Sequence, residues 1–145
     1  MKLNGSYTFP IARDTLWAAL MDPEVIGACL PGVQSFSAVA PDTYAFEVGF
    51  RVGIVSGAYK GTLEVRDVDA PNSYRMVVQG AGIRTDMKGE GSVALTPDDA
   101  TTTTLTFDGD VNVTGILARV GQRMMGTVAK QQIDRLFQCL SAKAG

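Results

Sequence analysis

Residues 2–9 alternate between apolar and polar side chains, with Leu3, Tyr7 and Phe9 on one face. This period of two is typical of a strand with one buried face. The alternation recurs in six later stretches, at 33–40, 43–52, 55–67, 73–84, 87–96 and 101–113. Several of the links between them carry turn residues, such as Pro41-Asp42 and Pro71-Asn72. Short links between consecutive strands predict an antiparallel, seven-stranded meander, which curls at this length.

Two short helices are predicted between the first and second strands. Residues 12–21 place Leu16, Trp17 and Leu20 at helical spacing, and Asp22-Pro23 ends this helix and starts another that runs through Ala28. A turn, Cys29-Leu30-Pro31-Gly32, follows. This apolar unit is expected to cover an opening in the sheet.

The end of the chain, residues 114–145, changes to a helical period. Its apolar residues are spaced by three and four in two runs: Leu117, Val120, Met124 and Val128, and then Ala129, Ile133, Leu136 and Leu140. Thr114 is the expected N-cap. A helix of about 28 residues is roughly 42 Å long. Because the apolar stripe drifts between the two halves, a bend near Gly121 or Gly126 is expected.

These elements predict an α+β fold in which the sheet wraps around the long helix, with the two short helices at one end. Strand periodicity places many glycines on the concave face: Gly57, Gly61, Gly80, Gly82, Gly89, Gly91 and Gly109. Each one is read first as a bend or a close approach of the backbone. Together they also leave volume that side chains do not fill, which indicates an apolar cavity.

Composition limits the function classes. The 145 residues predict one domain, 1–145, and a net charge of -2 without a basic run argues against nucleic acid. The chain has no histidine, the usual general base and metal ligand, so a Ser-His-Asp triad is excluded and neither metal nor cofactor is expected.

Cys29 and Cys139 are far apart in the sequence and form no CxxC motif. They are expected to be buried free thiols in a reducing cytosol, with neither a disulfide framework nor a zinc site. The polar, strand-like start predicts no signal peptide, and no apolar run approaches the roughly 18 residues of a membrane span. A cytoplasmic protein is therefore expected.

Arg119 and Arg123 lie one turn apart near the start of the long helix. They are read as a solvated face, with an anion site at the helix N-terminus as the alternative.

Five segments together resemble a known family. They are LWAALMDP at 16–23, CLPG at 29–32, YKG at 59–61, TLTF at 104–107 and VNVTGILARVG at 111–121. Along nearly its whole length, the chain resembles the CoxG family of carbon monoxide dehydrogenase subunits. That family has the helix-grip fold of the START/Bet v 1-like superfamily.

The resemblance implies a non-catalytic accessory protein of a molybdenum hydroxylase. Its members are implicated in handling a lipophilic quinone and in bringing the dehydrogenase to the membrane. It implies as partners a quinone-like or lipid-like molecule, a molybdenum hydroxylase and a membrane that is met peripherally. Some members carry a further C-terminal hydrophobic tail; this sequence ends at Gly145 without one.

We predict that the apolar ligand lies between the sheet and the first half of the long helix. The expected walls are Leu30, Phe46, Phe50, Tyr59, Met76, Met87, Phe107, Leu117, Met124 and Val128. One alternative is a polyketide cyclase-like enzyme of the same superfamily, for which Tyr44, Tyr59 and Tyr74 are the candidate polar groups. The other is a protein-interaction module with a filled core and no ligand.

Overall fold

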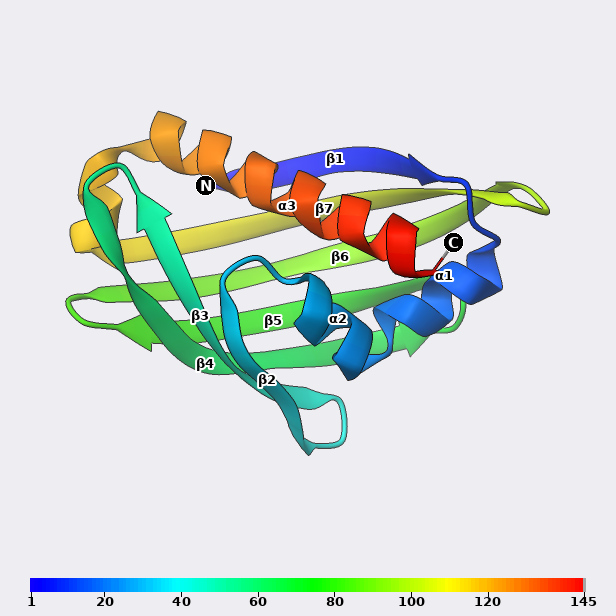
Figure 1. The fold of residues 1–145 in the computed structure, drawn as a ribbon, viewed down its shortest axis with the longest axis horizontal. Helices are drawn as coiled ribbons and strands as arrows, with labels where there is room; N and C mark the ends of the chain where they lie inside the picture. Colours follow the sequence, from blue (N-terminus) through cyan, green and yellow to red (C-terminus); the bar gives the residue numbers. More distant parts are fainter. Residues whose placement is uncertain (145) are drawn as a thin grey trace.

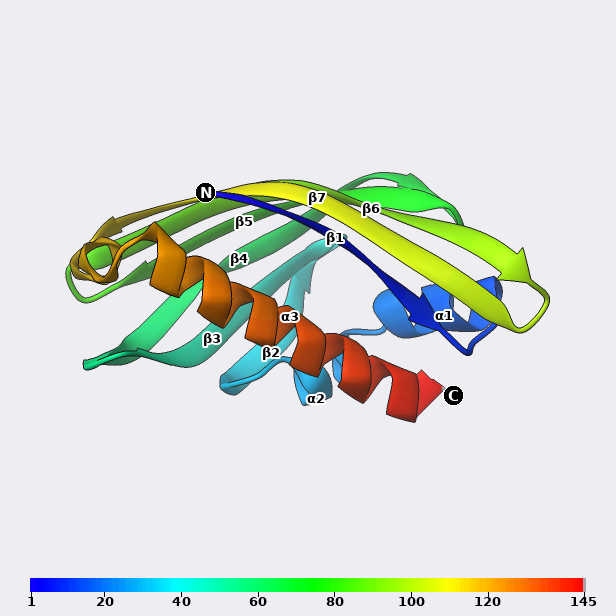
Figure 2. The same ribbon diagram turned by 90° about the horizontal axis from the view of Figure 1, so that it is seen from above.

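In the computed structural model, which describes residues 1–144, a curved antiparallel sheet arches over a long C-terminal helix (Figure 1, Figure 2). The seven strands lie in the order β1-β7-β6-β5-β4-β3-β2. Their bounds are β1 Lys2–Phe9, β2 Val33–Ala40, β3 Thr43–Val52, β4 Val55–Asp69, β5 Ser73–Gly82, β6 Thr85–Asp99 and β7 Thr102–Gly115. The helices are α1 Arg13–Leu20, α2 Pro23–Cys29, the 3₁₀ helix η1 Ile116–Val120 and α3 Gln122–Ala144. The predicted α+β helix-grip architecture is confirmed.

Strand register brings the apolar positions together on the concave face. Leu105 of β7 pairs with Leu95 of β6 and with Tyr7 of β1, and all three have apolar neighbours at the next inward position. Because side chains alternate between the two faces of a sheet, this register keeps polar residues on the convex side.

The two short helices are held at one end of the sheet by local hydrogen bonds. The Asp22 side chain caps α2 by accepting from the amide of Glu24 at 2.9 Å, and Pro23 occupies the first turn, where its missing N–H costs nothing. The fully buried Thr103 hydroxyl donates to the carbonyl of Ile11 at 2.7 Å. This bond fixes the link between β1 and α1 against β7.

The C-terminal segment differs from the single helix predicted over 114–145. Thr114 is not an N-cap: it lies in β7, where it pairs with Asp86. The chain then turns at Gly115, forms η1, and breaks at Gly121, whose φ of 91° favours glycine. Only α3, with 23 residues, is the long helix. Of the two positions expected for a bend, Gly121 is where the segment is interrupted, more sharply than by a bend, and Gly126 lies within α3.

The turn between β5 and β6 is also tighter than predicted. The sequence indicated strands at 73–84 and 87–96, but the strands are joined by Ile83-Arg84 alone. Arg84 adopts a φ of 59°, an uncommon conformation for a residue other than glycine. Sequence reasoning missed this turn because neither residue is a usual turn former.

Cys29 and Cys139 form a disulfide, so the prediction of two free thiols is wrong. Their Cα atoms lie 5.4 Å apart although 110 residues separate them in the chain. The last turn of α2 and the second half of α3 meet only through the tertiary fold, and spacing along the sequence carries no trace of that contact.

The core contains two packed clusters. The helix-end cluster gathers around α1, α2 and the second half of α3, with Phe9, Leu16, Leu105, Phe137 and Leu140 among its buried members. The tip-end cluster, at the other end of the sheet, is formed by Phe46, Val52, Tyr59, Leu117 and Met125.

Candidate functional site

A cavity of about 370 Å³ lies between the two clusters, under the concave face of the sheet. Its floor is formed by β3 to β7 and Leu3, and its cover by the α1–α2 unit and by Ile133, Leu136 and Phe137 of α3. Its polar neighbours include Glu90, Ser92 and Asp108, which are exposed residues that alternate with inward-facing ones. The site is therefore lined mainly by apolar side chains, as sites for apolar ligands are.

The cavity exists because glycines replace side chains in the middle of the floor. Gly91 of β6 pairs directly with Gly109 of β7, and Gly89 lies two residues away on the same face. A methyl group built on Gly91 would lie 2.9 Å from the carbonyl oxygen of Asp108. The backbones therefore approach closely here, and no side chain rises toward α3.

Gly61 and Gly80, two other inward glycines, do not create space. A methyl group on Gly61 would collide with the carbonyl oxygen of Gln79, so this glycine permits the close approach of β4 and β5. A methyl group on Gly80 would meet Phe46 and Tyr59 at 3.5 Å. Both positions belong to the filled part of the core.

Four of the ten predicted wall residues line the cavity: Leu30, Met76, Met87 and Phe107. Phe46, Tyr59 and Leu117 are buried in the tip-end cluster, and Phe50 and Val128 pack against it. Met124 lies beside the β3–β4 turn and is 46% exposed. The structure thus divides the ten residues between the cavity, a packed region next to it and, for Met124, the exposed surface.

The sequence analysis did not predict that the second half of α3 lines the cavity. The apolar stripe runs along the whole helical segment, so it does not show over which part of the sheet side chains are missing. The inward glycines did carry that signal. Counting register from the turns places Gly89, Gly91 and Gly109 side by side, and Ile133, Leu136 and Phe137 lie over that part of the sheet.

The three candidate tyrosines occupy different places. Tyr44 and Tyr74 border the cavity, and Tyr59 does not. Burial raises the pKa of Tyr74 well above its ordinary value. Burial also raises the pKa of Tyr59, and its hydrogen bond to Thr85 opposes part of that rise.

The hydroxyl of Tyr59 has a defined structural role. Thr85 Oγ1 donates to the carbonyl oxygen of Thr114 at 2.9 Å. Since that hydrogen is used, the Tyr59 hydroxyl is the donor in its 2.9 Å bond to Thr85. This pair joins β4 to the β6–β7 hairpin within the filled part of the core.

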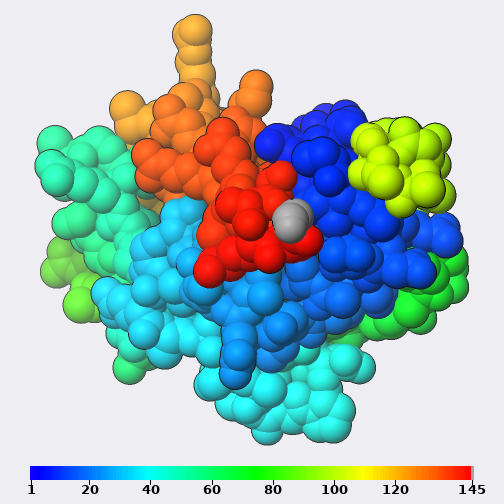
Figure 3. All heavy atoms as spheres, turned by 45° about the vertical axis from the view of Figure 1, so that its right-hand side comes forward, coloured from blue at the N-terminus to red at the C-terminus, as the bar shows by residue number. Residues whose placement is uncertain are grey.

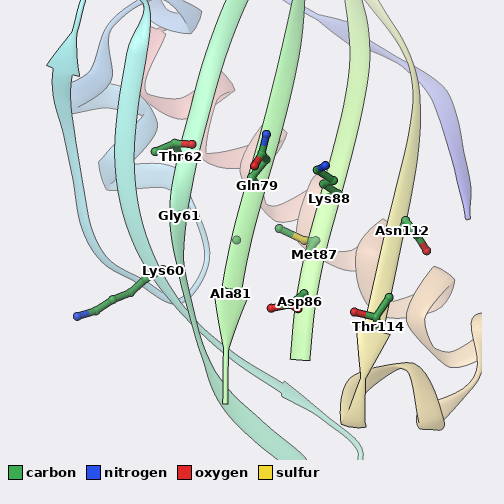
Figure 4. Close-up of a pocket in the computed structure, with 11 residues that line it drawn as sticks. Lys60, Gly61, Thr62, Gln79, Ala81, Asp86, Met87, Lys88, Asn112 and Thr114 are labelled. Atoms are coloured by element: carbon green, nitrogen blue, oxygen red, sulfur yellow. The ribbon is translucent and has the colours of Figure 1, made fainter. Parts of the chain in front are cut away.

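A second hollow, of about 520 Å³, lies on the convex face. Figure 4 shows its side chains spread over β4 to β7 without converging on one point. The polar residues around it, which are all exposed, are Lys60, Thr62, Gln79, Asp86, Lys88, Asn112 and Thr114. With no buried polar group among these lining residues, this hollow is the solvated outer surface of the sheet.

The β3–β4 and β5–β6 turns and η1 lie at the end of the molecule opposite α1 (Figure 1, Figure 2). Ile54, in the β3–β4 turn, is 102% exposed, and Ile83, in the β5–β6 turn, is 87% exposed. Met124 lies beside Gly53, and the amide of Ile116 donates to the carbonyl of Arg84 at 2.8 Å. The two turns, η1 and the start of α3 therefore form one surface, called here the tip face.

Charge on the molecule is polarised along the same axis. The segments 48–63, 77–85 and 111–133, which include the tip face, contain no Asp or Glu, and the first carboxylate after the β5–β6 turn is Asp86. Exposed arginines stand around the apolar residues there: Arg51, Arg84, Arg119 and Arg123. At the other end, the strand turns carry Asp42, Asp67, Asp69, Asp98 and Asp99.

The helices and the possible metal-ligating side chains of residues 1–144 also bear on the site. None of the helices described is both long and apolar enough to cross a membrane. Within the same residues, no three His, Cys, Asp or Glu side chains are grouped in a way that could hold a metal ion.

The model of the CoxG family of carbon monoxide dehydrogenase subunits matches residues 5–145. A conserved protein from Geobacillus kaustophilus has a similar structure, with a TM-score of 0.95 and 31% identity over 99% of this chain and 95% of that one. No curated protein matches the chain.

More distant structures share the fold. A START superfamily protein from Mycobacterium smegmatis gives a TM-score of 0.73 at 17% identity, covering 99% of this chain and 96% of its own. An aromatase/cyclase from Streptomyces gives 0.69 at 13% identity, covering 99% and 93%. At these identities the likeness concerns the fold alone.

Proposed function

The chain belongs to the CoxG family of carbon monoxide dehydrogenase subunits, and we propose that it is a non-catalytic accessory protein that carries a quinone-like or lipid-like molecule. The observation that carries this proposal is the apolar cavity of about 370 Å³ under the concave face. That volume is within the range of about 300–1,000 Å³ that ligand sites occupy. Burial of apolar surface at about 25 cal/mol per Å² would drive binding, offset by the cost of association.

The walls suit a ligand of adaptable shape. Met21, Met76 and Met87 line the cavity, and thioether side chains adjust to irregular guests. Phe36, Phe107 and Phe137 add flat aromatic surfaces. An apolar ring with a flexible tail is the ligand chemistry that such walls accept.

Extraction of the purified protein with organic solvent, followed by mass spectrometry, tests the proposal directly. We expect a quinone or a lipid. In parallel, the neutral fluorescent probe N-phenyl-1-naphthylamine should bind and be displaced by decylubiquinone. If nothing apolar is extracted and the probe does not bind, the interaction-module alternative replaces this proposal.

The cyclase-like alternative needs polar groups that act on a ligand. Of the three tyrosines considered, two border the cavity, and the raised pKa keeps Tyr74 protonated at neutral pH. A protonated tyrosine can donate a hydrogen bond but is a poor base. Single-turnover assays with aromatic polyketides should therefore show no product, and cyclisation that Tyr74→Phe abolishes would favour the enzyme.

The protein partner that we propose is a molybdenum hydroxylase of the carbon monoxide dehydrogenase kind, in keeping with the name of the family. The tagged chain should co-purify with that dehydrogenase from a host that produces both. A dehydrogenase that elutes alone under these conditions would contradict this partner.

We also propose a cytoplasmic location with peripheral membrane contact through the tip face. Ile54 and Ile83 gain by leaving water for the interfacial region of a bilayer, and the surrounding arginines complement anionic lipid headgroups. Each such cation contributes about 1 kcal/mol near an anionic surface. The acidic turns at the opposite end would orient the tip face toward the membrane.

Flotation with phosphatidylglycerol vesicles tests this contact. Replacing Arg84 and Arg119 by Gln should lower the partition constant by about tenfold or more, since two cations are lost. The matched control replaces Arg66 and Arg75, which are exposed on β4 and β5 away from the tip face, by Gln. Equal losses in the two double variants would show non-specific charge attraction and refute the tip-face contact.

A further inference from the structure

The disulfide links the two helices that cover the cavity. Cys29 is the last residue of α2, and Cys139 lies in the second half of α3. Figure 3 shows this part of α3 packed directly against the segment that contains α1 and α2. On one side of the bond, Ile26 and Leu30 line the cavity; on the other, Leu136 does so.

Helix α2 packs against three elements: β2, α3 and α1. It has only seven residues, too few for a helix to be stable by itself in water. Cys29 is its one buried residue, and this residue carries the bond to Cys139 of α3. The contacts of α2 with β2 and α1 are non-covalent, so the disulfide is the covalent link that holds α2 to α3 across the cavity cover.

The two sulfur atoms differ in access to a reductant. Cys29 is buried, and Cys139 is half-buried on the outer end of α3. A thiolate attacks the accessible sulfur of a disulfide first. In cytosolic proteins of mesophiles, such bonds are usually transient and report on redox state.

We propose that the Cys29–Cys139 pair is a redox switch that controls exchange of the molecule held in the cavity. In the oxidised form, the bond holds α2 against α3 and retains the ligand. In the reduced form, α2 and the turn that follows it move away from α3, and the ligand exchanges faster. This inference rests on the proposed carrier function.

The chemical step needs a dithiol reductant. Its thiolate attacks the sulfur of Cys139, forms a mixed disulfide and releases the Cys29 thiolate, which takes a proton. The second thiol of the reductant then displaces Cys139 and closes its own disulfide. Two electrons and two protons pass to the protein, and exchange with the disulfide form of the same reagent reverses the step and returns them.

The experiment compares the oxidised full chain with the chain reduced by dithiothreitol, with thiol content measured in each. Stopped-flow release of N-phenyl-1-naphthylamine into excess lipid vesicles should be about tenfold faster after reduction, because such differences fall mainly in the dissociation rate. The double variant Cys29→Ser/Cys139→Ser should release the probe at the fast rate with or without dithiothreitol. A second variant, Cys29→Ala/Cys139→Ala, serves if the buried serine prevents folding.

Hydrogen exchange gives an independent measurement. The amides of Ile26 and Leu30 donate to Asp22 and Ile26 within α2, and both should exchange faster after reduction. Amides in β7 should be unchanged. If exchange rises throughout the sheet, the disulfide stabilises the whole fold and does not control α2 locally, which would refute the proposed switch.

The outcomes separate the two proposals. If the probe binds both forms and leaves at equal rates, the switch is refuted and the carrier function stands. If the probe binds neither form of a folded protein, the carrier function is refuted, and the switch with it.

Discussion

The tip-end cluster and the cavity lie under the same concave face, yet one is filled and the other is hollow. Strands β3 to β7 contribute Phe, Tyr, Val and Met side chains to both. Over the tip-end cluster, Leu117 of η1 and Met125 of α3 fill the space. Over the cavity, Ile133 and Leu136 of α3 face a floor in which Gly91 pairs with Gly109.

The difference shows that residue type does not decide whether a side chain is core or wall. Phe46 and Phe107 are both inward-facing aromatic residues, and the first is buried while the second is half-buried beside the cavity. What stands opposite each of them decides its role. Paired substitutions, one in each region, can test this comparison.

The largest expected effect comes from removing one aromatic ring in each region. Phe46→Ala should cost about 3–5 kcal/mol of unfolding free energy, as core phenylalanines do. Phe107→Ala should cost less by about 1 kcal/mol or more, because atoms beside a void have fewer contacts to lose. Chemical denaturation of the two variants measures both values, and equal losses would mean that Phe107 is a fully packed core residue.

Adding side-chain volume should again cost more stability in the tip-end cluster, whereas it should weaken ligand binding only beside the cavity. Val111 and Val113 lie two residues apart on the inward face of β7, the first beside the cavity and the second against the tip-end cluster. Val113→Phe should cost about 1–3 kcal/mol through overpacking and leave probe affinity unchanged. Val111→Phe should keep stability within about 1 kcal/mol but weaken probe binding about 100-fold, or about 2.7 kcal/mol.

Denaturation and probe titration of the same two variants provide the measurement. A Val111→Phe protein that folds and binds the probe normally would place the ligand elsewhere.

Removing the Tyr59 hydroxyl should affect only the filled region. Tyr59→Phe loses the hydrogen bond to Thr85 and should lower the unfolding free energy by about 0.5–1.5 kcal/mol. Probe affinity should stay the same, because Tyr59 does not line the cavity. Thermal unfolding and probe titration check this prediction, and a change in affinity would extend the site into the tip-end cluster.

The smallest expected effect is on alkaline stability. Because the pKa of buried Tyr74 is raised, the unfolded chain loses the tyrosine proton at lower pH than the folded one. The contribution of Tyr74 to the free energy of unfolding is therefore fully present below about pH 9. It decreases as the pH rises, by about 0.4 kcal/mol at pH 10. Denaturation curves at pH 8 and 10 should show a smaller loss of unfolding free energy for Tyr74→Phe than for the unchanged protein. An equal loss in the two proteins would contradict this prediction.

Most of the fold could be predicted from the sequence. Period-two alternation located the strands and their inward faces, and the drift of the apolar stripe predicted a bend near Gly121 or Gly126, of which Gly121 is the break. The predictions that were wrong concern tertiary contacts or unusual local geometry. The Cys29–Cys139 bond joins distant segments, and the Ile83-Arg84 turn uses residues that rarely form turns.

The candidate site was predicted less completely for a physical reason. Periodicity shows which face of the sheet a residue occupies. It does not show which residues of the helix pack opposite that residue. Register across β6 and β7 supplies that information through Gly89, Gly91 and Gly109. Leu30 and Phe107 were identified from the inward pattern and the adjacent turn, whereas the walls from α3 required the three-dimensional arrangement.

The hollow between the clusters also has a mechanical consequence. Any part of this cavity of about 370 Å³ that water does not fill disappears when the chain unfolds, and unfolding then reduces the total volume of protein and solvent. Hydrostatic pressure favours the state of smaller volume. The protein without a ligand should therefore be more compressible than the protein whose cavity is filled. Compressibility then reports whether the cavity is occupied, without any label on the ligand.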